Sequence, residues 1–143
     1  MKHGFILFSF CLVLSACSDA GKDAAPASEN EIDAARNFIR ASLDGEFDKA
    51  KSYMLHDETN EQGLEQMELL IQKSRDTEEK AAYRNADIRI FNSRKLNDST
   101  YVVTYANTYK NKKDSLKLVR VQREWLVDFK YTFLNNGTAP DVR

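Results

Sequence analysis

The sequence predicts an α+β domain in which a group of helices is followed by an antiparallel sheet. Apolar residues recur at the spacing of amphipathic helices in residues 30–83. Residues 88–133 instead contain four segments with the alternation, or the β-branched and aromatic content, of strands. Because the strands form one run after the helices, an antiparallel meander is favoured over repeated βαβ units. The length of 143 residues, with 42% hydrophobic and 30% charged residues, suits one globular domain.

The first predicted helix covers residues 30–44. Ser28 and Glu31 have the spacing of a capping box, with Ser28 as N-cap. Gly45 is a natural residue to end the helix. The apolar stripe consists of Ile32, Ala35, Phe38, Ile39 and Leu43.

Three shorter helical segments are predicted to follow. The next helix carries Phe47, Ala50, Tyr53 and Met54 on one side and ends around residues 55–57. Thr59 and Gln62 form a second capping box before a third helix. The stripe of that helix consists of Leu64, Met67, Leu70 and Ile71. A restart with Thr77 as N-cap extends the helical pattern through Tyr83.

The four predicted strands begin at Ile88, at Thr100, at Ser115 and at Trp125. Residues 97–99, 110–114 and 122–124 are polar and predict the three turns. The last strand alternates cleanly: Trp125, Val127, Phe129, Tyr131 and Phe133 share one face. Asp128 falls on the opposite face, so we expect it to point to solvent or to an edge.

The N-terminus has the organisation of a secretory signal. A short basic head precedes an apolar run over residues 5–14, which is shorter than the roughly 20 residues of a membrane-spanning helix. Leu14, Ser15, Ala16 and Cys17 resemble the lipobox of bacterial lipoproteins at all four positions. That resemblance implies cleavage between Ala16 and Cys17 and a diacylglyceryl lipid on the Cys17 thiol. The alternative is an ordinary signal peptide that leaves a free thiol at Cys17.

These features divide the chain into four parts. Residues 1–16 form the lipoprotein signal peptide, 17–29 the lipidated Cys17 and a flexible tether, 30–134 the domain and 135–143 a frayed tail. Two or three acyl chains hold a protein durably on a membrane. We therefore expect a lipid-anchored protein of the bacterial cell envelope, with the choice between inner and outer membrane left open.

Three segments together resemble the nuclear transport factor 2-like superfamily, within the cystatin-like α+β folds. They are residues 35–50, with a helix followed by Gly-acid-aromatic-x-x-Ala, residues 98–103 and residues 124–128. The resemblance implies N-terminal helices packed on a curved four-stranded meander that encloses a conical cavity. Domains of this superfamily include enzymes, ligand-binding proteins and protein–protein interaction modules, so the fold does not choose the function.

A ligand-binding function would use apolar and aromatic residues that line such a cavity. The candidates are Phe38, Tyr53, Met54, Tyr105, Trp125, Phe129 and Tyr131. The same residues can instead fill the core, which the domain needs because a chain with a lipidated Cys17 has no disulfide. The leading hypothesis is a non-catalytic module that binds a small apolar ligand or an envelope protein.

The alternative is a cavity enzyme of isomerase or dehydratase type. The resemblance then implies Asp128 or His56 as the base, with a Tyr as hydrogen-bond donor. His56 is the one histidine after the signal and lies in a polar segment typical of a surface. With no second His and no usable Cys, neither a metal site nor a cofactor is expected apart from the acyl lipid.

The charge balance argues against a nucleic-acid partner. Lys and Arg total 21 and Asp and Glu total 22, for a formal net charge of −1, whereas nucleic-acid binders carry a basic excess. A local exception is the cluster of Lys110, Lys112 and Lys113. These lysines either contact anionic lipid or a partner, or form a solvated hairpin tip.

Overall fold

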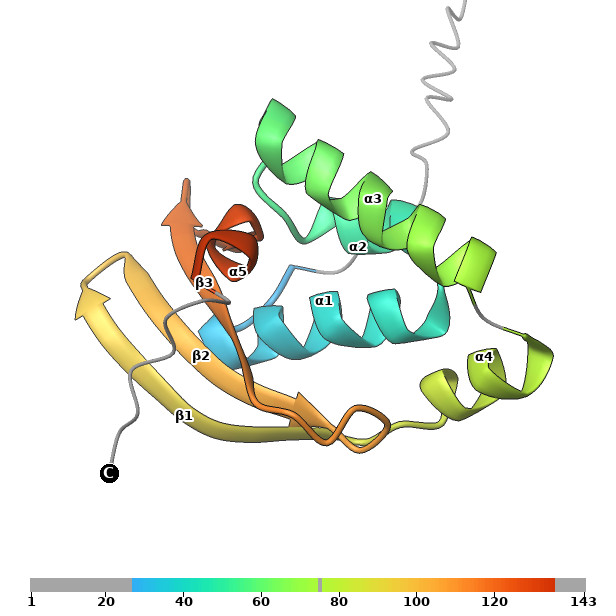
Figure 1. Cartoon of the computed structure of the whole chain (residues 1–143). Helices are drawn as coiled ribbons and strands as arrows, with labels where there is room; N and C mark the ends of the chain where they lie inside the picture. Colours follow the sequence, from blue (N-terminus) through green and yellow to red (C-terminus); the bar gives the residue numbers. More distant parts are fainter. Residues whose placement is uncertain (1–26, 75, 136–143) are drawn as a thin grey trace, which may run out of the picture.

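The computed structural model describes residues 27–74 and 76–135, and Figure 1 shows helices beside a four-stranded antiparallel sheet. The predicted α+β class and the order of helices before strands are confirmed. The predicted signal peptide, Cys17, most of the tether and the tail from residue 136 lie outside the described residues. No helix in the described part of the chain is long and apolar enough to cross a membrane.

Helix α1, Glu31–Asp44, has the predicted extent but a different N-cap. The Asn30 side chain accepts the Asp33 backbone N–H at 2.9 Å, and the Asp33 carboxylate accepts the Glu29 N–H at 3.0 Å. The prediction of Ser28 as N-cap is therefore wrong. At the other end, Gly45 adopts the left-handed conformation, with φ of 78°, as predicted for a helix stop.

Acidic side chains also replace the two threonines predicted to cap the later helices. α2 is Phe47–Ser52, α3 is Glu58–Ser74 and α4 is Thr77–Arg84. The Asp57 carboxylate accepts the Asn60 backbone N–H at 3.0 Å, so Asp57 rather than Thr59 caps α3. Asp76 accepts the Glu79 N–H and caps α4 in place of Thr77.

The apolar stripe of α3 is only partly buried. Leu64 and Ile71 belong to the core, and Met67 packs against it. Leu70, which the sequence places in the same stripe, is 66% exposed. The helix therefore contacts the core along a narrower band than its sequence pattern predicts.

The sheet contains β1, Ile88–Asn97; β2, Thr100–Asn107; β3, Asp114–Val121; and β4, Glu124–Asp128. The strands follow one another in the order β1-β2-β3-β4 and all neighbours are antiparallel, which confirms the predicted meander. Gln122 and Arg123 form a two-residue hairpin turn with φ of 48° and 76°. Glu124, predicted in this turn, is the first residue of β4.

The prediction that the last strand continues to residue 133 is wrong. The strand ends at Asp128, and α5, Lys130–Asn135, follows at once. Because β4 pairs only with residues 117–121, the first half of β3 has no strand on that side. α5 contacts β3 there, and the Thr132 hydroxyl donates to the Ser115 carbonyl at 3.0 Å. Tyr131, expected on a strand face, is therefore a helical residue.

The two edges of the sheet differ. The edge of β4 is covered by the residues after α2, since the Leu55 N–H donates to the Val127 carbonyl and the Val127 N–H to the Tyr53 carbonyl, both at 2.9 Å. This pairing is why α2 ends at Ser52 rather than near residue 56. The β1 edge carries two register shifts, which hinder edge-to-edge pairing of sheets.

The core lies between the helices and one face of the sheet (Figure 1). Its fully buried side chains include Met54, Val103, Leu116, Leu118 and Val127. Aromatic rings complete it: Phe38 and Phe129 pack with ring centroids 5.1 Å apart, and Phe129 contacts Phe133 at 4.7 Å. Such pairs add about 0.5–1.5 kcal/mol each beyond the area they bury.

Candidate functional site

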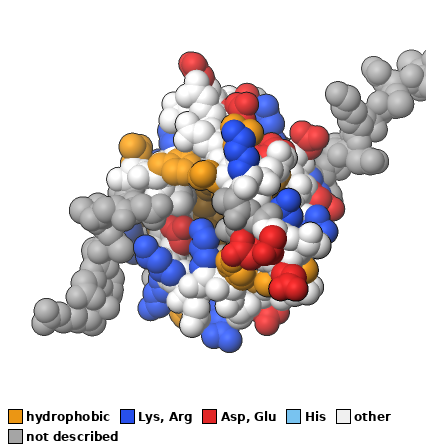
Figure 2. Space-filling model, turned by 45° about the vertical axis from the view of Figure 1, so that its right-hand side comes forward, with side chains coloured by type: hydrophobic (Ala, Val, Ile, Leu, Met, Phe, Trp, Pro, Cys, Tyr) orange, Lys and Arg blue, Asp and Glu red, His pale blue; other side chains and the backbone are white. Residues whose placement is uncertain are grey.

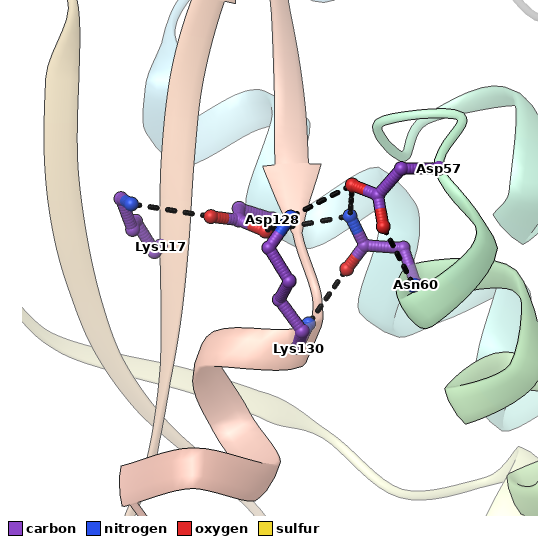
Figure 3. A network of polar contacts seen from close by, with 5 residues as sticks. All are labelled: Asp57, Asn60, Lys117, Asp128 and Lys130. Atoms are coloured by element: carbon purple, nitrogen blue, oxygen red, sulfur yellow. Dashed lines mark hydrogen bonds and ion pairs between the residues drawn. The ribbon is translucent and has the colours of Figure 1, made fainter.

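The polar cluster that joins α3, β3, β4 and α5 consists of Asp57, Asn60, Lys117, Asp128 and Lys130. Figure 3 shows these side chains converging on the end of β4. Asp128 is only 5% exposed, so the prediction that it points to solvent is wrong. Asn60 is fully buried. Buried polar groups of this kind are stable only when they are hydrogen-bonded.

Asp128 has a partner for each carboxylate oxygen. Its Oδ2 lies 3.1 Å from Lys117 Nζ, and its Oδ1 lies 3.1 Å from Lys130 Nζ and 3.3 Å from Asn60 Nδ2. Lys117 is placed by the sheet, because it stands directly opposite Asp128 in the β3–β4 register. Lys130 is placed by the tight turn from β4 into α5.

Asn60 uses its whole side chain. Its amide nitrogen donates to Asp57 Oδ2 at 2.7 Å and to Asp128 Oδ1, while its oxygen accepts the Lys130 backbone N–H at 2.6 Å. The first N–H groups of a helix have no partner inside the helix. A residue 70 positions earlier in the chain therefore caps α5 and fixes the point where the strand becomes a helix.

The two outer members, Asp57 and Lys130, form the second ion pair of the cluster, at 2.7 Å. The hydrogen bond from Lys130 is the main cause that lowers the pKa of Asp57 below its usual value. The same bond, followed by the bond to Asp128, raises the pKa of Lys130. Both groups therefore stay charged through the neutral range, and two Asp balance two Lys.

This arrangement is suited to holding structure together rather than to proton transfer. A general base needs an oxygen that can reach a substrate proton. Both Asp128 oxygens are already occupied by Lys117, Lys130 and Asn60, so neither is free to take a proton from a substrate. The cluster locks α3 and α5 to the end of the sheet.

His56, the second candidate base, lies apart from Asp128. Its side chain is 59% exposed and its Nδ1 is 3.4 Å from Glu61 Oε1. Glu61 also pairs with Lys51, and that contact is the first cause that lowers the pKa of Glu61. The structure therefore gives His56 and Asp128 separate sets of partners.

Five of the seven candidate cavity residues are buried in the core: Phe38, Tyr53, Met54, Trp125 and Phe129. Tyr105 is half-buried against the core, and burial raises the pKa of its hydroxyl well above the usual value. Tyr131 is half-buried on α5. Trp125 packs edge-on against Tyr101 at 5.4 Å, and the Arg120 guanidinium lies over its ring.

A small surface hollow touches two of these residues, Tyr53 and Trp125. It has room for about 40 Å³, whereas pockets for small molecules measure about 300–1,000 Å³. Its lining consists of Ala27, Ser28, Ser52, Tyr53, Glu124, Trp125 and Leu126. A hollow of this size suits one or two water molecules.

No group of three or more potential ligand side chains is arranged for a metal ion within residues 27–74 and 76–135. Comparison with protein-family models, with curated proteins and with solved structures finds no match to this chain. The resemblances drawn from the sequence therefore stay predictions.

Sequence reasoning missed four members of the polar cluster: Asp57, Asn60, Lys117 and Lys130. A two-residue turn at 122–123 would have placed Lys117 opposite Asp128, as the structure does, but the prediction put three residues in the turn. Nothing in the sequence indicates that Asn60 reaches α5, because α5 itself was not predicted.

Proposed function

We propose that this protein is a lipid-anchored lipoprotein of the bacterial cell envelope whose single domain, of the nuclear transport factor 2-like type, is a non-catalytic interaction module. Its covalent modification is the acyl lipid on Cys17, and the proposed function requires no cofactor. A protein partner fits the domain better than a small apolar ligand or a substrate.

The anchor rests on the four-residue motif Leu14-Ser15-Ala16-Cys17 behind a short apolar run. The chain between Cys17 and the first described residue, Ala27, is rich in Ala and includes Gly, Pro and charged residues. Such a composition is typical of linkers, and we propose that this segment tethers the domain to the lipid.

One observation favours an interaction module: five of the seven side chains that could have lined a cavity are buried in the core. Phe38 packs on Phe129 at 5.1 Å, and Met54 has no exposed surface. The candidate base Asp128 is held by Lys117, Lys130 and Asn60. A ligand or a substrate would have to displace core contacts, whereas a protein can bind the outer surface.

Replacing Cys17 tests the anchor. We expect Cys17→Ala to abolish incorporation of labelled fatty acid and to release the protein from the membrane fraction. Cys11→Ala is the matched control, because Cys11 lies in the apolar run that cleavage removes. A Cys17→Ala variant that still incorporates fatty acid would contradict the proposal.

Native-state mass spectrometry of the protein purified from its own cells tests the interaction module. We expect a stoichiometric protein to co-purify and to stay bound in the gas phase. A retained small apolar molecule in place of a protein would favour ligand binding instead. If the protein turns over a small substrate and Asp128→Asn abolishes that turnover, the alternative of a cavity enzyme is favoured instead.

A further inference from the structure

Although the net charge of the chain is near zero, acidic and basic residues are unevenly divided between its two halves. Residues 27–87, which contain α1 to α4, carry eight Lys or Arg against fifteen Asp or Glu. Residues 88–135, which contain the sheet and α5, carry ten against four. In Figure 2, Lys and Arg side chains gather at the lower left, in the part of the molecule that holds the sheet, and acidic side chains gather at the lower right.

We call the five basic residues Arg89, Arg94, Lys110, Lys112 and Lys113 the basic surface. All five are exposed. Arg89 and Arg94 stand opposite Ala106 and Val102 on β2, and Val103, which faces the core, alternates with Val102. The two arginines therefore lie on the sheet face turned away from the helices. The three lysines lie in the loop between β2 and β3.

The four acidic residues of the sheet half, which include the exposed Glu124, offset only part of the positive charge there. Asp128 is buried and paired with Lys117 and Lys130, and Asp98 pairs with Lys95 at 2.6 Å. Asp114 is half-buried beside the loop; burial raises its pKa, and the charges of Lys110 and Lys112 act against that rise. None of the five basic residues forms an ion pair with another residue of the described chain.

Exposed aromatic rings accompany these charges. Phe91 is 51% exposed, and Lys113 Nζ lies 4.8 Å from the centre of its ring. Tyr109, 37% exposed, lies in the same loop as the lysines. Lysine beside exposed aromatic rings is typical of surfaces that contact the headgroup region of a membrane.

We propose that the basic surface docks on anionic lipid headgroups of the membrane that carries the protein. The inference rests on the proposed lipid anchor at Cys17. Each Lys or Arg near an anionic membrane contributes a modest attraction, and clusters of such residues are typical of anionic-lipid binding. Because the lipid already holds the domain near the membrane, a weak surface suffices to orient it.

The length of the chain before the domain permits this contact. Ala27 precedes α1, and the 14-residue α1 spans about 21 Å. The loop with the three lysines lies near the C-terminal end of α1 (Figure 1). Arg40, in the last part of α1, donates to the Ala86 carbonyl, and the next residue, Asp87, accepts the Thr108 N–H at the start of the loop. Cys17 is ten positions before Ala27, a distance of about 35 Å when extended. The domain can therefore lie with its sheet on the membrane and its acidic helices turned away.

Lysine labelling in the anchored protein tests the docking. The purified lipoprotein is placed in vesicles of phosphatidylcholine, or of phosphatidylcholine with phosphatidylglycerol, and labelled with a membrane-impermeant amine reagent. We expect labelling of the three loop lysines to fall about threefold or more in the anionic vesicles and to recover in molar salt. Lys49 on α2 and Lys73 on α3 serve as internal controls whose labelling stays unchanged.

A pair of variants tests the role of charge. Arg89→Gln/Arg94→Gln should restore most of the labelling of the loop lysines in anionic vesicles. The matched control Lys49→Gln/Lys51→Gln removes two positive charges from α2 and should leave the protection intact. Equal effects of both variants would overturn the proposal.

Several outcomes separate the docking from the anchor. If the protein does not float with neutral vesicles, the anchor is contradicted. The docking is then judged separately, by whether the loop lysines are protected in anionic vesicles. Loop lysines that label equally in both kinds of vesicle would overturn the docking while leaving the anchor in place. Protection in isolated cell envelopes but not in anionic vesicles would assign the basic surface to an acidic protein partner and overturn the lipid proposal.

Discussion

Asn60 offers a sharp test of how the end of the sheet is held. Its side chain caps the Lys130 N–H and donates to Asp128, and it is fully buried. In Asn60→Ala the Lys130 N–H is left without a partner, which costs about 1–3 kcal/mol. The lost side-chain bonds to Asp57 and Asp128 together add about 1 kcal/mol, because Lys130 still satisfies Asp57, and Lys117 and Lys130 still satisfy Asp128. We therefore expect a loss of about 2–4 kcal/mol out of the total of about 5–15 kcal/mol that a small domain has.

Urea unfolding followed by the fluorescence of Trp125 measures this loss, because the chain has one tryptophan. Trp125 lies in β4, three positions before Asp128. Gln66→Ala is the control on the same helix, since Gln66 is exposed, and it should change the free energy of unfolding by less than about 0.5 kcal/mol. A loss in Asn60→Ala no larger than that of the control would refute the capping of α5 by Asn60.

Three further predictions concern a helix contact, a turn and a titration. A Cβ on Gly63 would collide with the Phe133 ring, so Gly63→Ala should destabilise the protein. In a Phe133→Ala background the same substitution should stabilise it by up to about 1 kcal/mol, because alanine favours a helix over glycine. If thermal unfolding shows that the two substitutions have additive effects, the contact between Gly63 and Phe133 is contradicted. Gln122 and Arg123 have positive φ angles that suit Asn and Gly, so Gln122→Asn/Arg123→Gly should raise the unfolding temperature, and an unchanged or lower temperature would contradict the turn assignment. Burial raises the pKa of Asp114, so its ionisation opposes folding above that pKa and stability rises as the pH falls through it. Asp114→Asn should therefore stabilise the protein at neutral pH and lose its advantage in acid, which chemical denaturation at a series of pH values measures.

The helix boundaries show what local patterns can decide. The stripe of α1 and the stop at Gly45 were predictable, because both depend on residues close in sequence. The N-caps were not, since Ser28 and Asn30 both have side chains that can cap, and only the geometry of the chain selects Asn30. For the same reason, Asp57 and Asp76 cap their helices in place of the neighbouring threonines.

The end of the chain shows where local patterns mislead. Residues 125–133 alternate as a strand would, yet the strand stops at Asp128 because distant groups satisfy the backbone of a helix instead. Asn60 accepts from Lys130, and Thr132 bonds to β3. The same contacts bury Asp128, a position that alternation alone assigned to solvent. A two-residue turn would have paired Lys117 with Asp128, but Asn60 and Lys130 could not be placed in the cluster because α5 was not predicted.

The membrane anchor is the claim on which the proposed function depends most. The most direct measurement is the mass of the N-terminal peptide of the mature protein, isolated from the membrane fraction of its own cells. We predict a peptide that begins at Cys17 and carries a diacylglyceryl group, with or without an acyl chain on its α-amine. A peptide that begins at Cys17 with a free thiol, or one that retains any residue before Cys17, would contradict the anchor.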